Sequence, residues 1–304
     1  MNTPERLTRP TVEAVDTLLG HPFPVLDHGF VRVIDYMGDE AAIVQAARVS
    51  YGRGTKATQE DTGLLRYLLR HNHTTPFEMC EIKLHMKLPI FVARQLIRHR
   101  TANVNEYSAR YSILAREFYV PALTDIQPQS TTNRQGRGGS YSDQDQLLLR
   151  DMIRGASGSS FDTYEDMIGE ESGFDLSREL ARIVLPLSTY TEWYWKVDLH
   201  NLLRFVKLRA DPHAQKEIRG YADIIGNLIE TWLPNVWEAF VDYQRDAVTF
   251  SRQEVEALRA LAARAGDEAR APFASLTGLS RREIAGFYDK LGVELDWEDT
   301  YGER

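Results

Sequence analysis

The amino-acid sequence predicts an α+β fold, with helices packed on a small, mostly antiparallel sheet and a C-terminal helical extension. Residues 30–35 and 80–88 have strand character, and the second segment alternates polar and apolar residues as a half-buried strand does. Many more segments carry apolar residues at helical spacing. From Ser177 onward the chain is predicted to be helical.

The composition is that of a folded protein without a membrane or nucleic-acid role. Of the 304 residues, 43% are hydrophobic, so the chain can bury a sizeable core. The net charge of −8 disfavours bulk nucleic-acid binding, which usually needs a basic surface. No apolar stretch is long enough to span a bilayer, and the first residues lack the apolar core of a signal peptide. The single cysteine, Cys80, allows no internal disulfide and predicts a cytoplasmic location.

Three parts are expected along the chain: an N-terminal arm over residues 1–24, a domain over residues 25–250, and a helical extension over residues 251–304. The arm has no clear periodicity. In the domain, helices are predicted over Glu40–Val49 and Thr62–Arg70. Their apolar positions are Ala42, Ile43, Ala46 and Ala47 in the first and Leu64, Leu65, Leu68 and Leu69 in the second.

Two helix starts are predicted before and after the strand at residues 80–88. Thr75-Pro76-Phe77-Glu78 has the form of a capping box with proline at the first helical position. Cys80 is interpreted as a packing residue rather than a nucleophile. Pro89 is predicted to open a helix that runs to about Arg100, and residues 103–108 are expected to be loop.

The second half of the domain begins with a polar insertion. Residues 124–146 are rich in Gln, Ser, Thr, Asn and Gly, and a disordered surface loop is the simplest interpretation. Asp198 is placed to cap a helix, and Asp211-Pro212 is predicted to end it and to start the next, which Pro234 ends. In the extension, Ser251 with Glu254 and Ser280 with Glu283 form predicted capping boxes.

Residues 98–112 hold the densest group of candidate binding side chains. Three guanidiniums, Arg98, Arg100 and Arg110, lie close in sequence to His99 and Glu106, among amides and hydroxyls. Arginine binds phosphate through a planar fork of donors, so this segment predicts a site for a phosphorylated small molecule. A solvated charged loop is the alternative. No His or Cys pair has metal-ligand spacing, so no metal site is predicted.

Five segments in a fixed order carry a family resemblance: residues 73–78, 89–95, 98–108, 181–187 and 208–215. They include His73-Thr74-Thr75-Pro76-Phe77-Glu78 and an Arg-His-Arg triplet followed, after seven residues, by Ser108. Together they resemble the flavin-dependent thymidylate synthases. Two departures are Asn103, where serine is usual, and His200, where some members carry arginine.

The resemblance implies a site for each ligand. It implies contacts to dUMP from Gln95, Arg98, Glu106, Ser108, Ala109, Arg110, Arg182 and Arg209. It implies contacts to FAD from Thr75, Arg98, His99, Arg100, Glu106, Asp198, His200 and Arg204. Arg209 is the candidate catalytic residue, because a cation beside a uracil ring nitrogen stabilises the ring anion. Plain alternatives are a helix salt bridge between Arg182 and Glu179, a solvated face for His200 and Arg204, and core positions for His73 and His213.

The implied activity is reductive methylation of dUMP to dTMP, with methylenetetrahydrofolate as carbon donor and NADPH-reduced FAD as hydride donor. The implied partners are these small molecules and, in a homotetramer, further copies of the chain that share each active site. Two alternatives remain open: a non-catalytic flavin- or nucleotide-binding regulatory module, and a folate- and flavin-dependent RNA-methylating enzyme, which the acidic balance disfavours.

Overall fold

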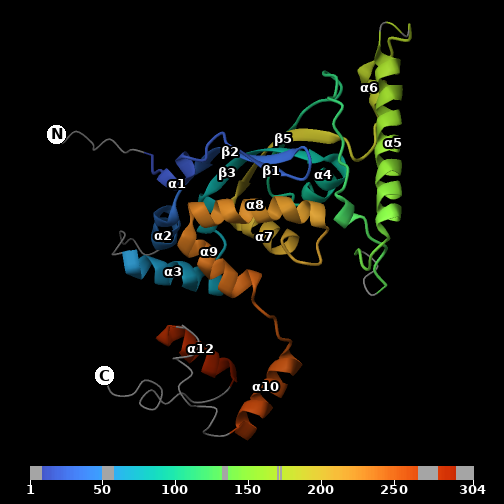
Figure 1. Cartoon of the computed structure of the whole chain (residues 1–304). Coiled ribbons are helices and arrows are strands. Elements are labelled where there is room, and N and C mark those ends of the chain that lie inside the picture. The colour runs from blue at the N-terminus through green and yellow to red at the C-terminus, as the bar shows by residue number, and fades with distance from the viewer. Residues whose placement is uncertain are drawn as a thin grey trace, which may run out of the picture. The chain divides into compact units, whose positions relative to one another are not determined.

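A computed structural model describes residues 9–49, 58–131, 136–169, 171, 173–265 and 280–291. The chain divides into two compact units, Met1–Asp246 and Ala247–Arg304. The first unit combines helices with one antiparallel sheet, which confirms the predicted α+β class (Figure 1).

The sheet of the first unit has the order β1-β2-β3-β5-β4. Its longest pairing joins β3 to β5, in register from Glu81 opposite Asp198 to Pro89 opposite Tyr190. All neighbouring strands run antiparallel. The strands are β1 (Pro22–Val25), β2 (Gly29–Met37), β3 (Glu81–Pro89), β4 (Asn103–Glu106) and β5 (Tyr190–Asp198).

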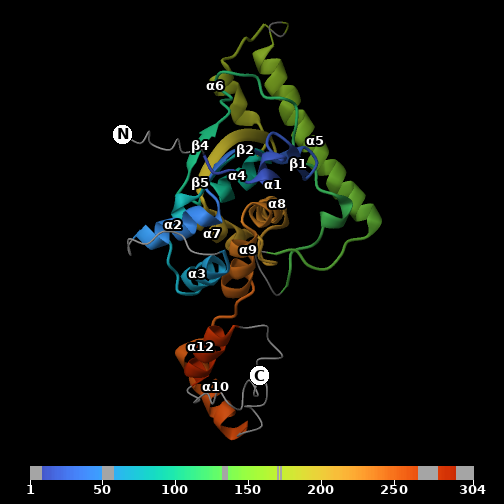
Figure 2. The ribbon, with the colours of Figure 1, turned by 90° about the vertical axis from the view of Figure 1, so that its left-hand side faces the viewer.

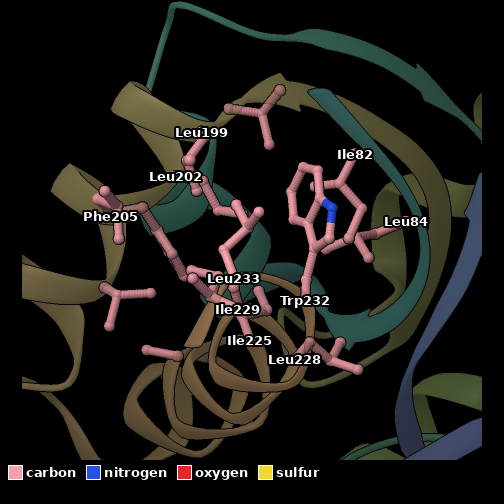
Figure 3. Packing of buried hydrophobic residues seen from close by; sticks show 14 of the residues in the cluster. Ile82, Leu84, Leu199, Leu202, Phe205, Ile225, Leu228, Ile229, Trp232 and Leu233 are labelled. Carbon is pink, nitrogen blue, oxygen red and sulfur yellow. The ribbon is translucent and has the colours of Figure 1, made fainter. Parts of the chain in front are cut away.

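The two faces of the sheet differ because alternate side chains point to opposite sides of a strand. On β3, Ile82 and Leu84 are buried, whereas Lys83 and His85 are only partly covered. Helices α7 (Leu199–Arg209) and α8 (Lys216–Trp232) lie over the apolar face. Figure 3 shows Trp232 of α8 beside Ile82 and Leu84 in this core.

The bounds of α7 agree with the sequence-based prediction, whereas the start of α8 does not. The Asp198 side chain accepts a hydrogen bond from the amide of Asn201 at 2.9 Å, which confirms the predicted cap of α7. The helix ends at Arg209, as predicted, but α8 does not start at Pro212: it starts at Lys216 after a turn. All six predicted apolar residues of α8 are buried: Ile218, Tyr221, Ile225, Leu228, Ile229 and Trp232.

The remaining elements of the first unit are mostly helical. Helix α2 has the predicted bounds, although Ile43 and Val44 are its buried residues rather than the alanines. The elements are α1 (Glu13–Asp16), α2 (Glu40–Val49), α3 (Thr58–Arg70), η1 (Phe77–Met79), α4 (Ile90–Leu96), η2 (Leu123–Asp125), α5 (Asp143–Ile168), α6 (Arg178–Ala181), η3 (Arg182–Val184), α9 (Pro234–Phe240) and η4 (Val241–Arg245). Helix α5 lies at the periphery of this unit in both views (Figures 1 and 2).

Several sequence-based expectations were wrong. Residues 103–108 are not all loop, because β4 pairs with β5, and β5 interrupts the helices expected after Ser177. Residues 13–25, which lie almost wholly in the expected arm, contain α1 and β1, and Val15 is buried. The predicted capping box at Thr75 is also wrong: η1 is a single 3₁₀ turn without a side-chain cap, because only the backbone carbonyl of Thr75 is used.

In the described part of the second unit, the chain forms the helices α10 (Arg252–Ala265) and α12 (Arg281–Leu291). Both predicted capping boxes are confirmed. The Ser251 amide donates to Glu254 at 2.7 Å, and the Ser280 amide donates to Glu283 at 2.8 Å, while each serine hydroxyl accepts in return. Ile284 of α12 is fully buried.

Candidate active site

A cationic cluster forms where the end of α4 meets α7. Nε of Arg209 donates a hydrogen bond to Nε2 of His99 at 3.1 Å. The His99 ring also packs edge-on against Phe205, with ring centroids 5.0 Å apart. Burial lowers the pKa of His99 to about 4, and the charges of Arg209 and Arg204 add to this effect. His99 is therefore a neutral imidazole beside two permanent cations at neutral pH.

The turn that holds Thr75 lies against this same helix. Element η1 contacts α7 and β5, and the amide of Leu199 donates to the carbonyl of Cys80 at 2.8 Å. Thr75 is exposed on this turn, and His200 is partly exposed on the first turn of α7. Both Asp198 oxygens accept from Asn201, so this carboxylate is occupied as a helix cap. The structure thus places most of the predicted flavin-binding residues on α7 or on segments that contact it: Thr75, His99, Asp198, His200 and Arg204.

A separate pocket of about 350 Å³ gathers part of the predicted nucleotide set. Glu106 at the end of β4 accepts a hydrogen bond from the hydroxyl of Thr191 at 2.7 Å, which fixes its carboxylate at the pocket wall. Ser108, Ala109 and Arg182 line the same pocket. The Ser108 hydroxyl accepts from the amide of Arg110 at 3.3 Å.

Glu179 connects Arg182, which lines this pocket, with Arg110, which does not. Its carboxylate accepts from Nη2 of Arg110 at 2.9 Å, and its backbone carbonyl accepts from Nε of Arg182 at 3.2 Å. The helix salt bridge considered between Arg182 and Glu179 is therefore wrong, because the carboxylate pairs with Arg110 instead. Arg182 remains exposed and free to bind an anion.

The other predicted nucleotide residues lie elsewhere in the chain. Gln95, Arg98 and Arg209 are not among the residues that line the pocket. Gln95 instead donates from Nε2 to Oε1 of Gln215, the residue that precedes α8, at 2.5 Å. Arg98 and Arg100 are exposed, and neither forms an ion pair with another described residue.

Comparison with known proteins then identifies the family. The family model described as thymidylate synthase complementing protein matches residues 32–235. A flavin-dependent thymidylate synthase of Ruegeria pomeroyi is 57% identical over 269 residues, which cover 88% of this chain and 87% of the relative. The chain belongs to the flavin-dependent thymidylate synthase family.

A further relative and a solved structure are also similar to this chain. A flavin-dependent thymidylate synthase of Gluconobacter oxydans is 56% identical, with 84% of each chain covered. A solved structure of the UMP/dUMP methylase PolB from Streptomyces cacaoi, bound with 5-Br dUMP, is 32% identical, with a TM-score of 0.64. It covers 73% of this chain and 99% of the PolB chain.

Two side chains that contact predicted site residues, Thr191 and Glu179, were not predicted from the sequence to belong to the site. Thr191 lies on the missed strand β5, and its alternation of aromatic and polar residues was the available signal. Nothing in the sequence showed that Glu179 would join two arginines. His73 and His213 are exposed, so the core positions considered for them are wrong. His213 shares a hydrogen bond between Nδ1 and the Asp211 carboxylate at 2.9 Å.

The described part of the chain contains neither a metal-binding cluster nor a membrane-spanning helix. No group of three or more His, Cys, Asp or Glu side chains there could hold a metal ion. No helix among those residues is both long and apolar enough to cross a membrane.

Proposed function

We propose that this protein converts dUMP to dTMP by reductive methylation, with methylenetetrahydrofolate as carbon donor and NADPH-reduced FAD as hydride donor. The observation that carries the proposal is the family membership, together with an arginine-rich site that contains no cysteine nucleophile. PolB, whose solved structure holds 5-Br dUMP, matches this chain over most of its length and supports a uridine nucleotide as substrate. A cytoplasmic location remains a prediction from the single cysteine.

For dUMP, we assign phosphate and ribose binding to Arg98, Arg110 and Arg182 and placement of the uracil ring to Glu106, Ser108 and Ala109. Guanidinium forks suit a phosphate dianion. Arg182 is exposed at the mouth of a pocket large enough for part of a nucleotide, which supports this assignment. Ser108 binds and orients, because His99, the histidine nearest to it in sequence, has a pKa lowered to about 4 and is a weak base.

Arg209 is proposed to stabilise the uracil ring as it gains electron density at its nitrogen. A preorganised cation stabilises a developing anion more than a neutral ring, so it acts mainly in the transition state. Its hydrogen bond to His99 holds the guanidinium in place without neutralising it, since His99 is uncharged.

The residues around α7 fit a flavin. The exposed guanidiniums of Arg98 and Arg100 have no acidic partner among the described residues, which suits a pyrophosphate. We propose that Thr75, His99, Arg100, His200 and Arg204 hold FAD, with Arg98 and Glu106 between the two ligands. Asp198 contributes by capping α7 rather than by direct contact. Reduced flavin supplies the hydride; the protein binds, orients and excludes water.

The separation of the proposed dUMP residues supports an assembly with shared sites. One group lines the pocket at Glu106, and another lies at α4 and the end of α7, outside that pocket. We propose a homotetramer in which one copy supplies Arg182 and its neighbours, and another supplies Arg98 and Arg209. The sheet face opposite α7 and α8 carries the partly exposed His85 and the exposed Tyr194, which supports contact with another copy.

The test is dUMP-dependent reoxidation of the reduced, FAD-loaded protein with methylenetetrahydrofolate present, followed by absorbance and by analysis for dTMP. We expect saturable FAD binding that His99→Ala or Arg100→Ala weakens. A protein without saturable FAD binding would overturn the proposal. Flavin and dUMP binding without dTMP formation would favour the non-catalytic alternative, which the presence of all five family motifs disfavours.

A further inference from the structure

A chain of hydrogen bonds connects the polar insertion to the proposed nucleotide site. Arg137, in the segment expected to be a disordered loop, forms an ion pair with Glu217 in the first turn of α8. Oε2 of Glu217 accepts from Nε2 of Gln215 at 2.8 Å. Oε1 of Gln215 accepts from Nε2 of Gln95 on α4 at 2.5 Å. Four side chains therefore lie in one continuous polar row.

The Glu217 carboxylate is the anchor of this row. Its side chain is 2% exposed, whereas that of Arg137 is 33% exposed. Burial alone would raise the pKa of Glu217, but the hydrogen bonds from Arg137 and Gln215 outweigh burial and lower it. The hydroxyl of Tyr119 adds a further donor at 3.1 Å. Glu217 is therefore an acceptor only.

The direction of every bond in the row follows from this one charge. A carboxylate accepts and cannot donate, so Gln215 must turn its NH₂ group toward Glu217. Its carbonyl oxygen then faces Gln95, which must donate its own NH₂ group in return. The carbonyl oxygen Oε1 of Gln95 is left as an acceptor. This argument does not depend on how the amide atoms of either glutamine are placed, because the carboxylate fixes both orientations.

We infer that Glu217, ion-paired with Arg137, is a positioning residue: through Gln215 it fixes the amide of Gln95, so that Gln95 presents its carbonyl oxygen to a donor group of the bound nucleotide. The inference rests on the proposed function for the role of Gln95 in dUMP binding. The donors that dUMP offers are the 3′-hydroxyl and N3–H.

The surrounding contacts fit this role rather than simple helix capping. Gln215 is the N-terminal capping residue of α8, yet its side chain makes no capping hydrogen bond. Tyr119 links the two helices that the row joins: its hydroxyl donates to Glu217 on α8, and its ring lies 5.8 Å from that of Phe91 on α4. On either side of Arg137, backbone hydrogen bonds hold the chain: the Ser130 amide donates to the Gly136 carbonyl at 2.9 Å, and the Gly138 amide donates to the Pro128 carbonyl at 2.9 Å.

The test is a double-mutant cycle on the FAD-loaded protein, with dUMP affinity measured by titration calorimetry. We expect Glu217→Gln, which introduces a neutral residue of the same shape, to weaken dUMP binding about fivefold, within the range of one hydrogen bond. Gln95→Leu should weaken dUMP binding at least as much. The double variant should bind dUMP no more weakly than Gln95→Leu alone, because Glu217 acts through Gln95.

A neighbouring ion pair provides the matched control. Lys216 pairs with Asp125 between the same two segments but lies outside the row. Lys216→Met should leave dUMP affinity unchanged, and all variants should keep the FAD affinity of the wild type. If Glu217→Gln does not fold, Gln215→Met cuts the row while keeping the buried ion pair, and the same non-additivity with Gln95→Leu is expected.

Additive losses in the cycle, with dUMP bound normally by the wild type, would overturn the inference and leave the proposed function intact. A wild-type protein that binds no dUMP would overturn the proposed function. Two analogues each lack one donor: 2′,3′-dideoxyuridine monophosphate lacks the 3′-hydroxyl, and N3-methyl-dUMP lacks N3–H. The analogue that lacks the donor to Gln95 should bind the wild type more weakly than dUMP does. Its affinity should not change further in Gln95→Leu. Full sensitivity to Gln95→Leu with both analogues would overturn the assigned acceptor role.

Discussion

Nε of Arg209 donates to Nε2 of His99 at 3.1 Å, so Nε2 of this imidazole is an acceptor and its proton lies on Nδ1. The two residues come from elements 110 positions apart in sequence. In this contact the His99 imidazole is neutral, and the hydrogen bond fixes the orientation of the Arg209 guanidinium. A neutral imidazole between two arginines can accept from one of them without adding to their mutual repulsion.

Arg209→Ala is expected to lower kcat more than it raises the KM for dUMP. Loss of one preorganised donor commonly costs about 3 kcal/mol, on the order of a hundredfold in rate. Arg209→Lys should recover only part of this loss, because an ammonium lacks the planar fork. Single-turnover flavin oxidation at saturating dUMP and folate, beside a dUMP isotherm, separates the two effects. Weak dUMP binding with normal saturated turnover would show a ground-state role instead.

The protonation of His99 should depend on Arg209. In the wild type its imidazole should titrate near pH 4, because burial and two cations lower its pKa. Removing one cation by Arg209→Ala should raise that pKa toward the ordinary value of about 6.5. Proton–carbon NMR of the histidine rings measures both. An unchanged His99 titration in the variant would contradict the described contact.

The same shift predicts how stability depends on pH. The pKa of His99 is depressed in the folded state, so between about pH 6.5 and 4 the unfolded chain binds more protons at this residue. The His99 contribution to the free energy of unfolding should therefore be present above about pH 6.5 and be lost as pH falls through 4. His99→Gln should flatten this part of the profile. Urea unfolding of both proteins across this range is the measurement.

Cys80→Ala should keep most of the activity. The thiol is fully buried, and burial with the nearby Asp39 and Glu40 carboxylates raises its pKa to about 12, so no thiolate is available. The loss of one buried sulfur should cost about 1 kcal/mol of stability. Turnover and thermal unfolding of the variant test both statements, and native protein should resist thiol reagents. Lost turnover with normal folding and flavin content would contradict a cysteine-independent reaction.

How much the sequence could predict depended on whether the signal was local. The caps at Asp198, Ser251 and Ser280 were predicted correctly because a cap depends on a few neighbouring residues. The apolar face of α8 was also predicted, since its spacing repeats over the whole helix. By contrast, β4 was missed because all four of its side chains are exposed, and its pairing with β5 is a long-range contact.

The site shows the same division. Family motifs in the sequence predicted ligand-binding roles for Gln95, His99 and Arg209, but not the contacts between them and other elements. The bond between Gln95 and Gln215 and the row to Arg137 join positions up to 120 residues apart. A polar composition predicted a disordered loop around Arg137, because composition cannot show that a buried carboxylate elsewhere needs a cation.

Truncation after Phe250 should preserve flavin and dUMP binding. The chain divides near Asp246, and the helices of the second unit have their own caps and buried residues. None of the proposed ligand-binding residues lies beyond Arg209. Ligand titrations and light scattering on the truncated protein test this. A truncated protein that assembles normally but does not bind dUMP would show that the extension contributes to the site.

Mixing two inactive variants should restore activity if each site is shared between copies. Arg182→Ala removes an arginine at the pocket of Glu106, and Arg209→Ala removes the cation beside His99. In a shared site, a mixed assembly contains some sites that receive an intact Arg182 from one copy and an intact Arg209 from another. With random mixing in equal amounts, about a quarter of the sites should be intact, the product of two halves. Each variant alone should stay nearly inactive, and a double variant mixed with wild type is the control for subunit exchange. Exchange without recovered turnover would show that Arg182 and Arg209 serve the same site from one chain.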